Sequence, residues 1–439
     1  MHEFKRQFPP PPPDWTRPRL VDIADRVTAR NAERNPNVLT ISAEFGLISQ
    51  REFFSRRVAS ESVNGYFLLE QGDFAYNKSY SRGYPLGAIR RLDRYQNGCV
   101  SPLYICFRPR ADAVNSDFLR HYLDGGAIDA GLAEVAKEGV RNHGLLNVGV
   151  SDFFSLEVPL PPVAEQRVVA EVLNTLDATI RQTEAIIEKL KQVKQGLLQD
   201  ILTRGIGTNG ELRPPKSEAP HLYKESTLGW IPVSWQVCRL SAACSLIRDG
   251  THLPPVRVES GPLLLSVRNM KDGQLVTTDQ DTHVAESFYL QMHKSWKIEK
   301  GDVLLAIVGA TIGKLALVGD LPRFTLQRSV AVLRGADTVI RNPFLFSGMS
   351  HQRFQDGLWA RVNQTAQPGI YLEQLGEMEL AVPPIAEQDA AIASLAALDG
   401  RLEIEHALLR KLGLQKSGLM DDLLTGRVRV TPLLQGHVA

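Results

Sequence analysis

The chain has 439 residues, of which 43% are hydrophobic and 23% charged, and its formal net charge is +1. This length exceeds what one ordinary hydrophobic core serves, so we expect two or three domains. The composition excludes a largely disordered chain, no apolar run is long enough to cross a membrane, and the near-neutral charge excludes a uniformly basic nucleic-acid binder.

The N-terminal residues Met1 to Lys5 lack the apolar stretch of a signal peptide, so we expect a cytoplasmic protein. Pro9 to Pro13 predict a short polyproline II segment. The first globular domain is predicted over residues 1–160. Gly72 to Lys78 form its clearest strand pattern, which begins at a Gly-Asp turn.

The most basic part of the first domain lies between Tyr76 and Arg110. It holds seven Lys and Arg residues against a single acid, Asp93, and tyrosines are interleaved with them. Lys and Arg contact DNA phosphates and read guanine edges, whereas Asn, Ser and Tyr add shorter hydrogen bonds. The same run also fits an ordinary solvated face. Taken alone, it does not identify a nucleic-acid interface.

A long helix is predicted over 161–204, directly after Pro161-Pro162, because proline is tolerated in the first helical turn but restricts the residue before it. Its apolar positions alternate by four and three, which is the seam of a coiled coil. The seam consists of Val169, Leu173, Leu176, Ile180, Thr183, Ile187, Leu190, Lys194, Leu197 and Ile201.

Residues 205–224 are rich in Gly and Pro and predict a linker, after which a second globular domain covers 225–382. Gly261 to Arg268 and Gly301 to Gly309 are strand patterns bounded by turns. We therefore expect both globular domains to be of the α+β class.

The helix segment is repeated. Residues 161–203 align without gaps to residues 383–425 at an offset of 222, with 17 identities in 43 positions, and Pro-Pro-x-Ala-Glu-Gln opens both copies. The second helix is predicted over 383–426, followed by a tail at 427–439. Both seams are polar at the same two places, among them Lys194 and Lys416. These lysines set the helix register or face a partner protein.

Each helix needs a partner along its apolar stripe, and the obvious partner is the other copy. We expect an α+β protein with two globular domains separated by two long helices that pair as an antiparallel coiled coil with a pseudo-twofold internal repeat. The alternative is that each helix packs on its own domain. A rod with a different reader at each end suits a split, asymmetric DNA sequence, because helix length then fixes the distance between half-sites.

Two short motifs of the second domain invite an enzymatic interpretation. Gly309 to Leu315 resembles a phosphate-binding loop, but it has one residue too few between the glycines and Leu in place of Ser or Thr. Asp249-Gly250-Thr251-His252 fits either a structural turn or a loop at the DNA. Neither an Asn-Pro-Pro-Tyr methyltransferase motif nor a Gly-x-Gly-x-x-Gly motif after a strand is present. We expect no catalytic and no metal site.

The cysteines show no CxxC spacing and have no nearby histidine pair, which argues against a zinc site and makes a disulfide framework unnecessary. We interpret them as buried apolar residues. They are Cys99, Cys106, Cys238 and Cys244.

Leu228 to Val237, Asp249 to His252, Gly301 to Leu305 and Val308 to Lys314 resemble the second target-recognition domain of Type I restriction-modification specificity subunits. The Pro-Pro-x-Ala-Glu-Gln segments at 161 and 383 look like the two conserved regions of that family. The first domain departs from the Asp-Gly-Thr-His pattern.

The resemblance implies a DNA-binding subunit without catalysis, in which each recognition domain reads one half of a bipartite asymmetric site. It implies that the helices set half-site spacing and dock two adenine-methylating modification subunits, which restriction subunits join. This subunit is expected to bind no cofactor; S-adenosylmethionine, ATP and Mg²⁺ are expected on its partners. A coiled-coil scaffold that binds proteins without DNA specificity is the alternative, and a regulator of split operators is a weaker one.

Candidate DNA contacts are drawn from the basic segment of the first domain and from the motif loops of the second. In the first domain they are Asn77, Lys78, Ser79, Tyr80, Arg82 and Arg90. In the second domain they are Thr251, His252, Arg268, Asn269, Thr311, Lys314 and Arg328.

Overall fold

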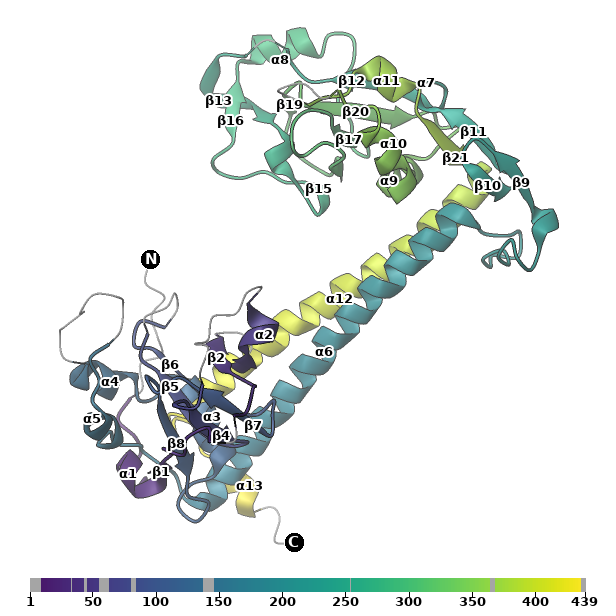
Figure 1. Cartoon of the computed structure of the whole chain (residues 1–439). Helices are drawn as coiled ribbons and strands as arrows, with labels where there is room; N and C mark the ends of the chain where they lie inside the picture. The colour runs from purple at the N-terminus through teal and green to yellow at the C-terminus, as the bar shows by residue number, and fades with distance from the viewer. Residues whose placement is uncertain are drawn as a thin grey trace. The chain divides into compact units, whose positions relative to one another are not determined.

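The computed structural model describes residues 9–32, 34–42, 46–54, 63–79, 84–136, 146–252, 254–363 and 368–435. The chain forms two compact units. Unit 1 consists of Met1–Ala185 and His406–Ala439, and unit 2 consists of Ile186–Glu405 (Figure 1). Each unit contains one globular domain and one part of each long helix, so the unit boundaries cut through the helices and not between helix and domain.

Unit 1 is built on an antiparallel sheet with the strand order β1-β8-β5-β6. Its strands are β1 (Ala24–Arg26), β8 (Ile105–Pro109), β5 (Phe74–Asn77) and β6 (Ala88–Arg91). Two strand pairs accompany it, β2 (Leu39–Ser42) with β3 (Gly46–Ser49), and β4 (Phe67–Glu70) with β7 (Asn97–Val100). The helices described here are α1 (Leu20–Ile23), α2 (Gln50–Phe53), α3 (Ser116–Asp124), α4 (Asp129–Val135), α5 (Val150–Phe154) and α13 (Thr431–Gln435).

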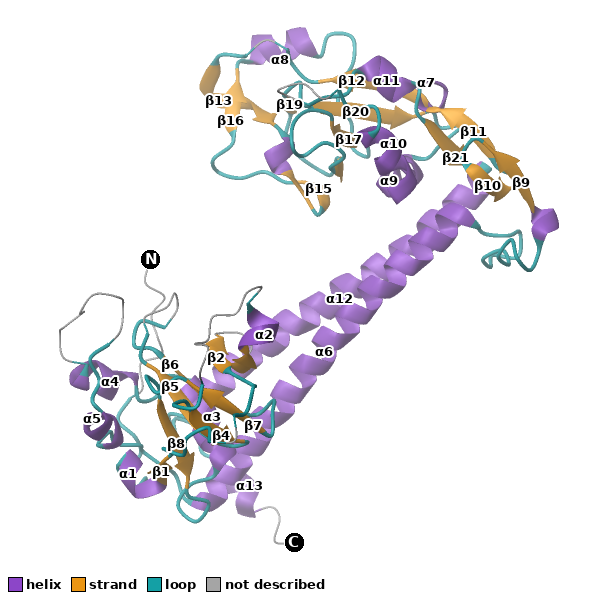
Figure 2. Cartoon of the chain, viewed as in Figure 1, coloured by secondary structure: helices purple, strands orange, loops and turns teal. Residues whose placement is uncertain are grey.

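Unit 2 repeats that order at the start of a larger sheet, β12-β20-β17-β18-β15-β14. Figure 2 labels β12, β20, β17 and β15 of this sheet. These strands are β12 (Cys244–Asp249), β20 (Val330–Gly335), β17 (Val303–Ala306), β18 (Leu315–Leu317), β15 (Gly273–Leu275) and β14 (Met270–Lys271). A second sheet contains β13 (Arg257–Leu265), β16 (Thr282–Val284) and β19 (Phe324–Leu326), and further pairs are β9 (Tyr223–Ser226) with β10 (Gly229–Pro232), and β11 (Gln236–Arg239) with β21 (Glu379–Val382).

The helices of unit 2 lie around these sheets. They are η1 (Pro220–Leu222), α7 (Leu240–Ala243), η2 (Val267–Asn269), α8 (Glu286–Met292), α9 (Asn342–Ser350), α10 (Gln352–Trp359) and α11 (Leu372–Gly376). Both globular domains thus mix helices with mainly antiparallel sheet, which confirms the predicted α+β class.

The shared sheet order comes with a shared buried ion pair. Asp73 precedes β5 and Asp302 precedes β17, and both carboxylates are fully buried. Each accepts two hydrogen bonds from an arginine of the neighbouring strand, Arg108 at 2.6 and 2.9 Å and Arg334 at 2.7 and 2.9 Å. The Gly-Asp turns that the sequence singled out are therefore equivalent positions, where a buried carboxylate is tolerated because its charge is paired.

The long helices begin directly after the Pro-Pro pairs, as predicted. Helix α6 covers Val163–Thr203 and helix α12 covers Ile385–Leu423. Every predicted seam position is buried or half-buried, including the polar ones. In unit 1 the seam joins the main core, because Leu173 of α6 and Leu423 of α12 lie in one cluster with Phe74 and Phe107. In unit 1 the start of α6 and the end of α12 are thus part of the domain core.

Two ion pairs fix the register of the helix pair. In unit 2, Lys194 of α6 binds Asp399 of α12, and in unit 1, Lys416 of α12 binds Asp177 of α6. In an antiparallel helix pair, the numbers of facing residues add up to a constant, and the two ion pairs give the same sum. The predicted antiparallel pairing is confirmed, and the seam lysines are explained by register.

The Gln of each Pro-Pro-x-Ala-Glu-Gln motif binds the globular domain of its own unit. Gln166 accepts from the amide of Asn115, the N-cap of α3, at 2.8 Å, and donates to the carbonyl of Pro161 at 2.9 Å. Gln388 makes the same bonds to Arg341, the N-cap of α9, and to Pro383, each at 2.8 Å. Both side chains are almost fully buried, so the motif fixes how each helix leaves its domain.

The Glu of each motif binds the segment that follows the other helix. In unit 1, Glu165 accepts from Arg429 at 2.6 and 3.0 Å, and in unit 2, Glu387 accepts from Arg213 at 2.8 Å. Because the start of one helix holds the chain after the end of the other, these pairs fasten the helix pair inside each unit. Charge-assisted, two-pronged bonds of this kind are strong and directional.

Buried tryptophans at equivalent places follow a proline turn in both units. The amide of Trp15 donates to Pro12 at 3.1 Å, and that of Trp235 donates to Pro232 at 3.0 Å. The indole of Trp235 also donates to Glu387 at 2.9 Å. The proline run therefore ends in a turn that places an indole in the core, which the matching Pro-x-x-Trp spacing could have revealed.

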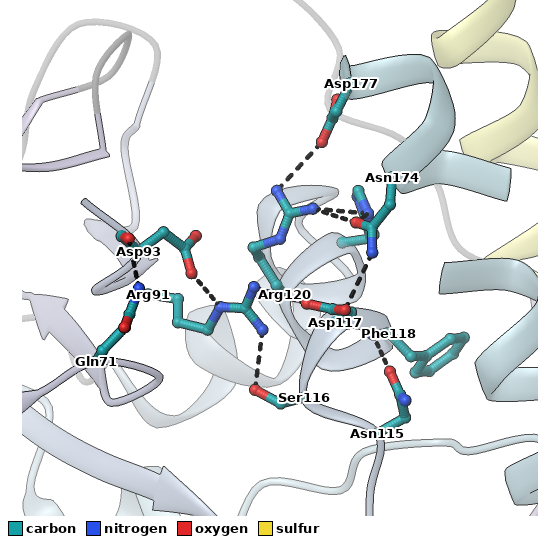
Figure 3. Close-up of polar contacts among 11 residues, drawn as sticks. Gln71, Arg91, Asp93, Asn115, Ser116, Asp117, Phe118, Arg120, Asn174 and Asp177 are labelled. Atoms are coloured by element: carbon teal, nitrogen blue, oxygen red, sulfur yellow. Dashed lines mark hydrogen bonds and ion pairs between the residues drawn. The ribbon is translucent and has the colours of Figure 1, made fainter. Parts of the chain in front are cut away.

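A polar network joins α3 to α6 in unit 1 (Figure 3). Arg120 donates to Asp177 at 3.2 Å and to Asn174 at 2.6 Å, while Asn174 donates to Asp117 at 3.0 Å. The Nε2 atom of His121 lies 2.9 Å from both Arg120 and Asn174. The equivalent helix α9 carries Phe346 and Ser347 at the matching places, so this network is not repeated there; α9 instead joins α12 through the ion pair of Arg341 with Asp389 at 2.9 Å.

Burial, helped by the charge of Arg120, lowers the pKa of His121 from 6.5 to about 4. The folded chain then keeps His121 neutral while the unfolded chain protonates it near pH 6.5, so stability from this residue is complete above pH 6.5 and is lost as the pH falls towards 4. We predict that the wild type loses about 2–3 kcal/mol more than His121→Gln between pH 7 and pH 4.5 in urea unfolding. Parallel pH profiles would contradict this role.

Candidate nucleic-acid interface

The Asp-Gly-Thr-His motif forms a tightly packed loop at the end of β12 in unit 2. A Cβ atom at Gly250 would overlap the backbone carbonyl of Leu326, so only glycine fits there. Thr251 is buried, and its amide donates to Leu326 at 2.8 Å. This packing turns His252 outward, where its imidazole lies 2.9 Å from Asp249 and its side chain is 68% exposed.

Three further loops meet this one through backbone hydrogen bonds. The amide of Arg328 donates to Thr251 at 3.2 Å, that of Ile307 donates to Ser329 at 2.9 Å, and that of Ile370 donates to Ile307 at 3.0 Å. The loops after β12, β17 and β19 and the segment before α11 are therefore held as one surface. A surface fixed by backbone bonds presents its side chains without a further ordering cost.

The loops enclose a half-open hollow of about 510 Å³. Its floor is aliphatic, and its rim carries polar and aromatic side chains that include two residues predicted from the sequence, His252 and Arg328. The hollow is lined by Asp249, His252, Ile307, Val308, Arg328, Asn363, Gly369, Ile370, Tyr371 and Leu372.

Thr311 and Lys314 lie outside the hollow, on the turn between β17 and β18. Both side chains are exposed, and the carbonyl of Thr311 accepts the amide of Lys314 at 3.1 Å. Gly309 and Gly313 adopt positive φ angles of 88° and 90° at the ends of this turn. The segment that resembles a phosphate-binding loop is thus a glycine-bounded hairpin turn.

Arg268 and Asn269 are placed elsewhere in unit 2, on η2. The Arg268 side chain is exposed and pairs with Asp281 at 3.2 Å. Asn269 is buried and donates to Asp281 and to the carbonyl of Val276 while accepting the amide of Ser266. Asn269 thus holds its own loop together and presents no surface to a ligand.

In unit 1, Asn77, Lys78 and Ser79 form the end of β5 and the residues after it. Asn77 accepts the amide of Ser79 at 3.1 Å, and the Lys78 ammonium donates to the carbonyl of Val148 at 3.4 Å. The amide of Leu146 also donates to the carbonyl of Lys78 at 3.0 Å, as that of Ile370 does to Ile307 in unit 2, so the two units bring equivalent loops together. The candidates Tyr80 and Arg82 lie outside the described residues.

The basic segment of the first domain is largely neutralised by acids from elsewhere in the chain. Arg90 pairs with Asp124 at 3.0 Å, and it also donates to the Tyr84 hydroxyl at 2.8 Å and stacks on the Tyr84 ring. Arg91 pairs with Asp93 and, at 2.7 Å, with Asp117. Acids that only folding brings close are not visible when charges are counted along the segment, and these arginines are paired with such acids in the fold.

The described part of the chain contains no group of three or more His, Cys, Asp or Glu residues that could hold a metal ion. Among its cysteines, Cys99 and Cys106 are buried, and Cys238 and Cys244 are half-buried. Burial raises the pKa of Cys106 and of Cys244 to about 12, which keeps both thiols protonated. In the same described residues, no helix has the length and apolar character needed to span a membrane.

Comparison with protein families gives a match that includes parts of both globular domains and both long helices. Residues 95–192 and 274–413, together more than half of the chain, match the model of the Type I restriction modification DNA specificity domain. The chain belongs to this family. The resemblance inferred from the motifs is thereby confirmed, and the family explains why one chain carries the same sheet and helix plan twice.

Relatives by sequence are specificity subunits of Type I restriction enzymes. The MjaVIII subunit of Methanocaldococcus jannaschii is 26% identical over 303 residues, which cover 68% of either chain. The EcoBI subunit of Escherichia coli is 27% identical over 296 residues, covering 65% of this chain and 59% of that one.

Solved structures share the fold. A chain from a study of complex assembly and conformational transition of the type I R-M system has a TM-score of 0.54 at 18% identity, with 95% of this chain and 100% of that chain covered. The S subunit of a Type I system from M. genitalium has a TM-score of 0.51 at 16% identity, covering 93% and 96%.

Substitution of Gly250 tests whether the packed loop positions the interface. In Gly250→Ala, the added methyl group meets the backbone of Leu326, so we expect the loops around the hollow to separate and DNA affinity to fall about tenfold or more. Gly319→Ala is the matched control, because nothing lies within 4 Å of a Cβ atom there. Equal DNA binding by the two variants, measured by titration of the assembled complex, would refute the assignment.

Proposed function

We propose that this chain is the DNA sequence-specificity subunit of a Type I restriction-modification complex and that each globular domain reads one half of a bipartite asymmetric site. The observation that carries the proposal is the family match across both halves, combined with two units that share a sheet order but differ in their exposed loop residues. Shared scaffolds with different surface residues suit two readers of different sequences.

The proposed contacts in unit 2 are the exposed side chains around the joined loops, namely His252, Thr311, Lys314 and Arg328, with Arg268 further away. In unit 1 they are Asn77, Lys78 and Ser79, together with Tyr80 and Arg82. Asn269 and Arg90 are proposed to stabilise the loops and not to contact DNA, because their polar groups bind Asp281 and Asp124 within the fold. Thr251 acts through its backbone bonds, which orient the loop.

Catalysis is assigned to partner proteins. We infer that two modification subunits bind the helix regions and methylate adenine with S-adenosylmethionine, and that restriction subunits add the ATP- and Mg²⁺-dependent step. The chain itself is proposed to be non-catalytic and to bind no cofactor. An adenine stacked in a duplex must be flipped into an active-site pocket for methylation. One subunit can therefore recognise the sequence while another carries out the chemistry.

Reconstitution tests this function. The purified chain should neither methylate nor cut DNA, whereas its complex with the modification subunits of the same host should methylate adenines at one bipartite sequence, as read by methylome sequencing. Its DNA affinity should fall with rising salt, because phosphate contacts release counterions. Methylation by the chain alone would refute the proposal, and DNA binding without salt dependence would favour the alternative of a protein-binding scaffold.

Helix length is proposed to set the distance between half-sites. Seven residues inserted after Ala185 in α6 and seven after Glu405 in α12 keep the heptad phase and lengthen both helices by about 10.5 Å, or about three base pairs. We expect the methylated sequence to gain about three base pairs of spacer with unchanged half-sites. An insertion into α6 alone misaligns the seam and should abolish activity. An active double-insertion complex with the original spacing would exclude this role.

A further inference from the structure

We propose that the hollow of unit 2 is a base-contact site in which Tyr371 and Asn363 determine specificity. Neither residue was selected by any sequence motif. The inference rests on the proposed function, since it takes unit 2 to be a DNA reader. Beyond that function, the hollow is assigned as the part of unit 2 that distinguishes bases, through an aromatic ring and an amide.

Tyr371 is the first indication. The residue is 70% exposed, although tyrosine usually buries much of its ring. The backbone beside it is fixed, because the amide of Ile370 donates to Ile307 at 3.0 Å and that of Leu375 donates to Tyr371 at 2.9 Å as α11 begins. A rigidly mounted, exposed aromatic ring with a hydroxyl group is typical of a residue that contacts a partner.

The rim of the hollow supplies hydrogen-bonding groups suited to base edges. Arg328 is exposed and makes no ion pair among the described residues, so its guanidinium is available to a guanine edge. The Asn363 amide can read the N6 and N7 positions of adenine in the same way. His252 is oriented by Asp249. These groups come from separate loops, yet all line one hollow.

The aliphatic floor of the hollow indicates that it contacts bases and not only phosphates. Ile307, Val308, Ile370 and Leu372 present aliphatic surface, which attracts a base face or a thymine methyl group and offers nothing to a phosphate. A surface that contacted only phosphates would need basic groups without this floor. The combination of an apolar floor, an exposed tyrosine and mixed donors and acceptors therefore indicates base contact.

Unit 1 differs at the matching place. The short helix before the Pro-Pro pair is α5 in unit 1 and α11 in unit 2, and its N-cap is Gly149 in the first and Tyr371 in the second. Neighbouring backbone contacts are retained, since Leu146 donates to Lys78 at 3.0 Å much as Ile370 donates to Ile307. The scaffold is thus kept while the side chains change, as expected if these positions give the two half-sites different sequences.

The test is base selection by the full complex with its modification subunits. Tyr371→Ala and Asn363→Ala are each compared with the wild type on a library in which every base of the bipartite site is varied. We expect discrimination to fall roughly tenfold at one or two adjacent positions of a single half-site, with the other half-site unchanged. Tyr371→Phe, which keeps the ring, should retain any preference that depends on stacking.

Trp230→Ala is the matched control, because Trp230 is an exposed aromatic residue of unit 2, 44% exposed, that lies outside the hollow. It should leave base preference unchanged. A preference unaltered by both Tyr371→Ala and Asn363→Ala would overturn the inference, as would an equal loss of binding on every sequence, which marks a phosphate contact. If the wild-type complex shows no bipartite preference at all, the proposed function fails instead.

Discussion

The structure depends on the two adjacent polar residues, Glu and Gln, in the first turn of each long helix. The buried Gln binds the N-cap of a helix in the globular domain, and the Glu binds an arginine that follows the other helix. One turn of helix thereby joins three parts of a unit: the domain, its own helix and the end of the partner helix. Buried polar groups satisfied from several sides specify a single arrangement, because any other leaves them without partners. The internal sequence repeat thus encodes the same set of contacts in both units.

The two units share the interactions that hold the recognition loops in place, and they differ in the exposed residues of those loops. The buried Asp-Arg pairs, the sheet order and the crossed Lys-Asp pairs of the helices recur in both. The exposed loop residues do not, and neither does the polar network of Arg120 and His121, because the equivalent helix of unit 2 carries Phe346 and Ser347 at these places. A chain that must present two recognition surfaces can vary these regions independently, provided that the joints are kept.

The sequence predicted the local features well. The helix starts, the seam and the antiparallel pairing follow from proline positions and from a period of 3.5, both of which are visible in a short segment. It could not show the partners of Glu165 or Gln166, which lie far away along the chain. Charge counting could not show that Arg90 pairs with Asp124, because Asp124 approaches only on folding. The hollow was missed for the same reason: four loops create it, and neither Tyr371 nor Asn363 stands in a recognisable motif.

The pairing of Glu165 with Arg429 is the most direct place to test whether the joint holds each unit together. A double-mutant cycle on the full chain compares Glu165→Gln, Arg429→Gln and the double variant by urea unfolding, and it separates this pair from the bond between Arg429 and Asp14. The joint predicts a coupling energy of about 2 kcal/mol, because the Glu165 carboxylate is buried and accepts two bonds from one guanidinium. A coupling energy near zero would contradict it, since the two side chains would then be neighbours without holding the helix ends in place.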